Sequence, residues 1–139
     1  MAVCSSTTRL IFRKLHDDAT GRFREWVNEA RNRSGIYVIR GRNSRGAWRV
    51  LYVGMSKTGT LDQTFKRHFY PWGDVPALDG TSARFECANR DHGPGVRYDR
   101  RKVEGAIVFM PPAAAPACEK RLIAQLRPRD NCDSNAAPF

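Results

Sequence analysis

The chain has 139 residues, of which 41% are hydrophobic and 27% are charged, and its formal net charge is +10. This length predicts one domain with one core, and the apolar fraction excludes a disordered chain. No apolar run approaches the roughly 20 residues that a membrane span requires. Arg9, Arg13 and Lys14 interrupt the first residues, which argues against a secretory signal. We therefore expect a cytoplasmic protein without a membrane partner.

Cysteine usage excludes one class of metal site. The four cysteines, Cys4, Cys87, Cys118 and Cys132, are scattered and form no Cys-x-x-Cys pair, which argues against structural zinc. In a reducing compartment we expect plain thiols rather than disulfides.

Positive charge is concentrated in one stretch. From Ala30 to Gly73 the only acidic residue is Asp62, whereas arginines and lysines recur throughout. A segment this one-sided favours a polyanionic partner, and nucleic acid is the default; the alternative is a merely basic surface. The residues that we expect to contact nucleic acid are Arg40, Arg42, Arg49, Lys57, Lys66 and Arg129.

The N-terminal part predicts an anchoring segment and a helix. An apolar patch over residues 10–15 suits a strand or an anchoring turn. A structural helix is expected from residue 17 or 18 to 32, because apolar residues recur there at helical spacing. These residues are Phe23, Trp26, Val27 and Ala30.

Two antiparallel strands are expected next, over residues 35–40 and 47–53, joined by a turn over 41–46. Alternation puts Tyr37 and Tyr52 in positions where they can share one face of the sheet. In the first strand Ile36 and Val38 form one face, and Tyr37 and Ile39 the other. In the second strand the faces are Trp48, Val50 and Tyr52, and Leu51 and Val53.

The rest of the chain completes an α/β fold of the α+β type. A helix is expected from Thr60 or Asp62 to Phe69 or Tyr70, with Leu61, Phe65 and His68 on one side. Residues 83–87 predict a short strand, 103–110 a clear strand and 117–126 a final helix after a proline-rich break.

Three residue types in this arrangement suit phosphodiester cleavage. Such a site must activate water and balance charge on phosphorus, and a hard divalent cation held by a carboxylate does much of this. Glu119, expected in the first turn of the final helix, is the candidate ligand; the alternative is a partner of the helix dipole. Tyrosine is an uncommon general base, although nearby cations can lower its pKa by favouring the phenolate. The alternative is that Tyr37 and Tyr52 are ordinary strand aromatics.

The spacing of these residues resembles the GIY-YIG nuclease superfamily. The matching segments are Gly35-Ile36-Tyr37, then Tyr52-Val53-Gly54, then a helix with Arg67 and His68. The far end agrees, because Glu119 followed by residues 122–131 and ending at Asn131 is similar to the nuclease module of bacterial excision-repair endonucleases.

The resemblance implies a three-stranded antiparallel sheet flanked by helices, and a DNA endonuclease that uses one metal ion. It implies that Tyr37 is the base or positions the water, and that Tyr52 bonds to that phenol, the water or the phosphate. Glu119 would bind Mg²⁺, with Mn²⁺ as a substitute. Asn131 would orient a phosphate or brace the site.

One position departs from the family pattern. Many members carry a catalytic arginine one helical turn before the residue that matches His68, and here that position is Thr64. Arg67 is the expected substitute, since it is a helical neighbour of residue 64 and its side chain can lean over the preceding turn. His68 is expected to contact the phosphate or the base, or to pack as a helix histidine. His16 and His92 are expected at the surface.

Three functions remain open at this point: an active endonuclease, a binding module that has lost cleavage, and a basic scaffold for a protein partner. We expect residues 1–33 to form an N-terminal extension with a helix packed on the core, 34–131 the nuclease domain, and 132–139 a tail. Specificity would come from loops over 70–80 and 87–99, a homodimer or a separate partner.

Overall fold

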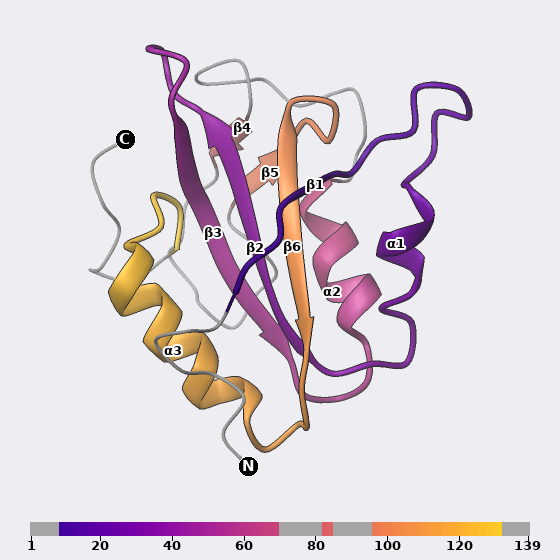
Figure 1. Cartoon of the computed structure of the whole chain (residues 1–139), viewed down its shortest axis with the longest axis vertical. Helices are drawn as coiled ribbons and strands as arrows, with labels where there is room; N and C mark the ends of the chain where they lie inside the picture. The colour runs from indigo at the N-terminus through magenta and orange to yellow at the C-terminus, as the bar shows by residue number, and fades with distance from the viewer. Residues whose placement is uncertain (1–8, 70–81, 85–95, 132–139) are drawn as a thin grey trace.

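The computed structural model describes residues 9–69, 82–84 and 96–131. The fold is of the α+β type, and its centre is a four-stranded antiparallel sheet with the strand order β1-β6-β2-β3 (Figure 1). A two-stranded sheet, β4-β5, accompanies it. The strands are β1 (Arg13–Lys14), β2 (Gly35–Arg42), β3 (Trp48–Ser56), β4 (Ser82–Arg84), β5 (Val96–Tyr98) and β6 (Val103–Phe109).

The sheet has one strand more than the three that we expected. β6, β2 and β3 are the expected strands, and β1 adds to the edge of β6, where Arg13 pairs with Gly105 and Lys14 with Glu104. A strand was one of the two alternatives expected over residues 10–15, but its place in the sheet was not predicted, because β1 consists of two exposed charged residues without alternating hydrophobicity.

The β2–β3 hairpin carries a bulge that changes which side chains share a face. Ile39 pairs with Tyr52 and Arg40 pairs with Val50, so Leu51 is the extra residue of β3. Leu51 therefore packs in the same core cluster as Ile39, and the prediction of strict alternation along the second strand was wrong. The predicted faces of the first strand, Ile36 with Val38 and Tyr37 with Ile39, are confirmed.

Helices cover both faces of the sheet (Figure 1). The first core cluster contains Val27 of α1 and Leu61 and Phe65 of α2, packed with Tyr37. The second contains Cys118, Leu122 and Ile123 of α3, packed with Ile36 and Val38. The helices are α1 (Glu25–Asn28), α2 (Leu61–Lys66) continued by the 3-10 helix η1 (Arg67–Phe69), and α3 (Ala115–Leu126).

The long helix expected before residue 32 is wrong, because only Glu25–Asn28 is α-helical. The preceding residues form a turn in which the Asp17 amide donates to the Arg22 carbonyl at 2.8 Å and Gly21 adopts a φ of 71°. The Asp17 carboxylate accepts from the Ala19 amide at 2.9 Å, a local bond that competes with helix formation. His16 is buried and bridges to Phe23, so its expected surface position is also wrong.

The last helix begins at Ala115, two residues before the expected start, with Pro116 in its first turn. Glu119 consequently lies beyond the first turn, where a carboxylate would interact with the helix dipole. The alternative role as a partner of the helix dipole is therefore not supported. Cys118 is buried and disulfide-bonded, which corrects the expectation of plain thiols.

Several expectations fall outside the described residues. These are Cys4, Cys87, Cys132, His92, the strand over 85–87, most of the two specificity loops and the tail over 132–139. Within the described part of the chain, no helix is long and apolar enough to cross a membrane.

Candidate active site

The candidate site is built around a hydrogen bond between two buried side chains. The Tyr37 hydroxyl lies 2.8 Å from Nε2 of His68. Tyr37 comes from β2 and is 1% exposed, and His68 comes from η1 and is 0% exposed. A buried phenol and a buried imidazole satisfy each other in this arrangement. The phenol donates to Nε2 in one tautomer of His68 and accepts from it in the other.

Gly54 makes room for the Tyr37 ring. The two residues are cross-strand partners, and a Cβ at position 54 would lie 2.3 Å from both Cζ and the hydroxyl oxygen of Tyr37. The phenol therefore lies directly over the backbone of β3. The glycine that follows Tyr52-Val53 is explained by this close approach, which no other residue permits.

Tyr52 stacks beside the buried pair. Its ring lies 6.2 Å from that of Tyr37, with an angle of 17° between the planes, and 4.4 Å from the His68 ring. Tyr52 is half-buried, whereas Tyr37 and His68 are inaccessible, so it is the member of this trio that faces solvent. Phe65 and Tyr98 complete the aromatic packing around Tyr37 and His68.

The surroundings raise the pKa of Tyr37 well above its usual value of 10. Burial is the largest cause, and Tyr52 and Glu119 also raise the pKa, whereas Arg67 lowers it. Arg67 lowers the pKa of Tyr37, as expected of a nearby cation, but desolvation outweighs it and the net shift is upward. The charges of Arg67 and Glu119 therefore both act on the phenol.

Arg67, and not residue 64, carries the positive charge near the phenol. Arg67 is exposed at the start of η1. Thr64 is half-buried, and its hydroxyl lies 3.4 Å from that of Thr60, which in turn lies 3.1 Å from the Ser56 hydroxyl. Thr64 thus belongs to a chain of hydroxyl groups at the start of α2.

Asn131 braces β3. Its amide oxygen accepts from the Val53 backbone amide at 3.0 Å, and its amide nitrogen donates to the Val53 carbonyl at 2.9 Å. The Asp130 amide donates to the Leu51 carbonyl at 2.8 Å. The two residues therefore pair with β3 on both sides of Tyr52, so of the two expected roles the observed contacts match the bracing one.

A neighbouring polar cluster was not predicted from the sequence. The Tyr98 hydroxyl donates to Asp130 at 2.9 Å, and Arg129 donates to both carboxylate oxygens of Asp130 at 2.7 Å. Arg129, expected to contact nucleic acid, is thus engaged inside the protein. Adjacent arginine and aspartate in a loop give no periodic signal, and their partner Tyr98 is set by the tertiary fold alone.

The expected DNA-contacting residues fall into two groups. Arg40 donates to Glu104 at 2.5 Å, and Arg42 lies 4.1 Å from the Trp48 ring, so both make contacts within the protein. Lys66 is half-buried, and its ammonium donates to a neutral partner, the amide oxygen of Asn28, at 2.6 Å. The remaining two, Arg49 and Lys57, are exposed on β3 and in the loop that follows it.

Glu119 suits a cation that needs few protein ligands. Among the described residues there is no group of three or more His, Cys, Asp or Glu side chains able to hold a metal ion. Mg²⁺ commonly uses one or two carboxylates and completes its shell with water and substrate phosphate oxygens. A half-buried carboxylate in electrostatic range of Tyr37 fits that mode of binding.

No protein-family model, curated protein sequence or solved structure matches this chain. The candidate site therefore rests on the side chains described above.

Proposed function

We propose that this protein is a metal-dependent endonuclease of the GIY-YIG type that hydrolyses phosphodiester bonds in DNA. The observation that carries the proposal is the hydrogen bond between Tyr37 and His68. Tyr52 stacks on Tyr37 and lies tilted against His68, and the charges of Arg67 and Glu119 act on the phenol. These five side chains come from four elements, β2, β3, η1 and α3.

Tyr37 is the proposed base, and His68 gives it the means to act. A phenol is protonated at neutral pH, and burial raises the pKa of Tyr37 further, so Tyr37 can take a proton from water only if its own proton leaves. Nε2 of His68, 2.8 Å away, is the acceptor for that proton. Tyr52, the solvent-facing ring, positions the water or a phosphate oxygen.

Glu119 is the proposed ligand of Mg²⁺, with Mn²⁺ as a substitute. The bound cation would polarise the scissile phosphate as a Lewis acid. Position 64, where many family members carry a catalytic arginine, is a threonine here. Arg67 takes that role and balances the negative charge that develops on the phosphate oxygens. Asn131 acts indirectly, by holding β3 and therefore Tyr52 in position.

Cleavage of a DNA panel tests the proposal. Single-stranded, duplex, branched and modified DNA are each incubated with Mg²⁺ or Mn²⁺ and with a chelator. We expect metal-dependent nicking of at least one form, and loss of nicking in Arg67→Gln and in His68→Ala. An absence of cleavage for every DNA and RNA form with metal present would refute the proposal.

A second candidate function is nucleic-acid binding without cleavage. Thr64 favours it, because a hydroxyl group cannot balance phosphate charge as an arginine at this position would. It predicts salt-sensitive binding, no turnover, and binding that Tyr37→Phe leaves unchanged. Appearance of cleavage only in Thr64→Arg would support this candidate. Lack of nucleic-acid affinity at low salt would instead indicate the basic protein-interaction scaffold.

A further inference from the structure

A cavity of about 500 Å³ lies between the turn over residues 17–22, α1 and the end of α2. Its volume falls in the range of ligand pockets. Most of its lining side chains are charged or polar, and Phe23 supplies an aromatic wall. The lining residues are Asp17, Thr20, Gly21, Arg22, Phe23, Glu25, Asn28, Lys66 and Arg100.

Lys66 presents a fixed positive charge to this cavity. Its ammonium donates to the amide oxygen of Asn28 at 2.6 Å and lies 5.5 Å from the Phe23 ring. The Asn28 amide is itself oriented, because its nitrogen donates to Glu25 at 3.3 Å. Among the described residues Lys66 makes no ion pair, so a neutral amide holds a half-buried ammonium whose charge is available to an anion.

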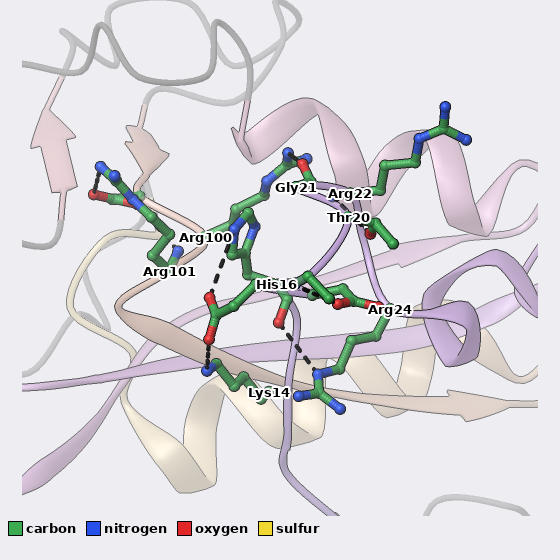
Figure 2. Close-up of polar contacts among 12 residues, drawn as sticks. Lys14, His16, Thr20, Gly21, Arg22, Arg24, Arg100 and Arg101 are labelled. Carbon is green, nitrogen blue, oxygen red and sulfur yellow. Dashed lines mark hydrogen bonds and ion pairs between the residues drawn. The ribbon is translucent and has the colours of Figure 1, made fainter.

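Arg100 provides a second fixed cation beside the first. It is 5% exposed, its Nη2 donates to the Gly21 carbonyl at 2.5 Å, and its guanidinium carbon lies 4.5 Å from the Phe23 ring. Figure 2 shows Arg100 reaching Gly21, with Arg22 extending away from His16 and Arg100. Two cations of the lining are therefore anchored over one aromatic ring.

We propose that this cavity binds a phosphodiester group of the nucleic acid strand on which the candidate site acts. The three cations of the lining, Arg22, Lys66 and Arg100, exceed its two carboxylates, Asp17 and Glu25, by one. This balance suits a singly charged phosphodiester better than a free phosphate dianion. Thr20 offers a hydroxyl group to the sugar of the same nucleotide.

The chain joins the cavity to the candidate active site. Lys66 lines the cavity, and the next two residues, Arg67 and His68, belong to the site. Phe69 then packs back against Phe23, with 5.7 Å between the rings. A strand bound at both places would be gripped on either side of η1. The identity of the partner rests on the proposed function, whereas the anion site rests on the cavity itself.

Binding measurements on three lysine variants test the inference. Each is made in a Glu119→Gln background, so that DNA is bound without being cut. Lys66→Gln removes the charge, Lys66→Arg retains it, and Lys102→Gln removes an exposed charge that does not line the cavity. Thermal melting of each variant confirms that it folds.

We expect Lys66→Gln to weaken DNA binding by about 10-fold. The plot of log affinity against log salt concentration has a negative slope, and we expect Lys66→Gln to reduce its magnitude by about 0.9 for duplex DNA. Lys66→Arg and Lys102→Gln should retain more of the affinity. In a series of oligonucleotides with one neutral methylphosphonate linkage each, one position should weaken binding to the Lys66 protein and have no effect on Lys66→Gln.

The outcomes separate this inference from the proposed function. Equal affinity of Lys66→Gln and Lys102→Gln for every oligonucleotide would overturn the inference and leave the endonuclease standing. If Lys66→Gln weakens binding and the protein with Glu119 in place cuts no DNA, the results would support the inference and refute the endonuclease. If inorganic phosphate competes for the cavity and no methylphosphonate position has an effect, the cavity binds a free anion. That result would overturn the inference that it binds a phosphodiester of DNA.

Discussion

Gly54 sets the geometry of the candidate site at the scale of single residues. The Tyr37 phenol occupies the space that a side chain at position 54 would need, and this placement brings the hydroxyl to His68. The motif thus joins a tyrosine on one strand to a glycine on the next for a steric reason. The pair can be tested independently of any activity.

Gly54→Ala should destabilise the protein by about 1–3 kcal/mol, because the added methyl group would lie 2.3 Å from the phenol and force the ring to move. Chemical denaturation measures this change. Most of the penalty should vanish when Gly54→Ala is introduced into a Tyr37→Ala protein, since the clash is then absent. Simple additivity of the two substitutions would contradict the steric account.

Buried phenols also predict how stability depends on pH. The pKa values of Tyr37 and Tyr98 are raised well above 10 in the folded protein, in both cases mainly by burial. The contribution of these protonated phenols to the free energy of unfolding is therefore fully present below pH 10. It is lost as the pH rises from 10 toward the folded pKa values, because over that range only the unfolded chain releases the protons. Each phenol should add about 1.4 kcal/mol per pH unit to the fall in stability.

Unfolding free energies measured at closely spaced pH values from 8 to 11 would reveal this fall. Tyr37→Phe should make the alkaline fall shallower, because one buried ionisable group is gone. An identical slope in Tyr37→Phe and the unmodified protein would show that Tyr37 is not protected from ionisation in the folded state.

At the scale of elements, β3 is held on one side by β2 and on the other by residues 129–131. Asn131 contributes the two side-chain bonds to Val53. Because Tyr52 precedes Val53, any slack in this edge moves the solvent-facing phenol. A residue near the end of the described chain therefore acts on the site through a strand.

Asn131→Ala should lower the unfolding free energy by about 1–3 kcal/mol, since it leaves the amide and carbonyl of Val53 without their side-chain partner. It should not change the salt dependence of DNA binding, because no phosphate contact is lost. The opposite pattern, an unchanged melting temperature with a lower salt slope, would assign Asn131 to phosphate.

Some elements follow from the sequence and others do not. Leu61, Phe65 and His68 lie at helical spacing, and all three are buried. The bulge at Leu51 could not be foreseen, because register is chosen by pairing between strands and not by the alternation within one. The stripe from Phe23 to Ala30 predicted a long helix, but local bonds of the Asp17 turn override that preference.

The whole molecule places its charges unevenly around this framework. Arg40 and Arg129 form ion pairs with Glu104 and Asp130, so part of the positive charge is engaged within the fold. Arg49 and Lys57 remain exposed for a polyanion. Sequence composition alone predicted a basic surface but could not separate these two groups, because ion pairing depends on which segments meet in space.

The division into an extension over residues 1–33 and a nuclease domain over 34–131 stays a prediction. Within the described residues, the N-terminal part contributes Val27 to the core and most of the cavity lining. Its removal should therefore affect strand binding and stability together.

The central claim is that Glu119 supports metal-dependent hydrolysis beside the Tyr37–His68 pair. The most direct measurement is the single-turnover cleavage rate of a DNA substrate in Mg²⁺ by the unmodified protein, Glu119→Gln and the exposed control Glu29→Gln. We predict that Glu119→Gln lowers the rate by about 100-fold or more, with unchanged melting temperature and DNA affinity, whereas Glu29→Gln cleaves normally. Equal rates for Glu119→Gln and Glu29→Gln would contradict the account.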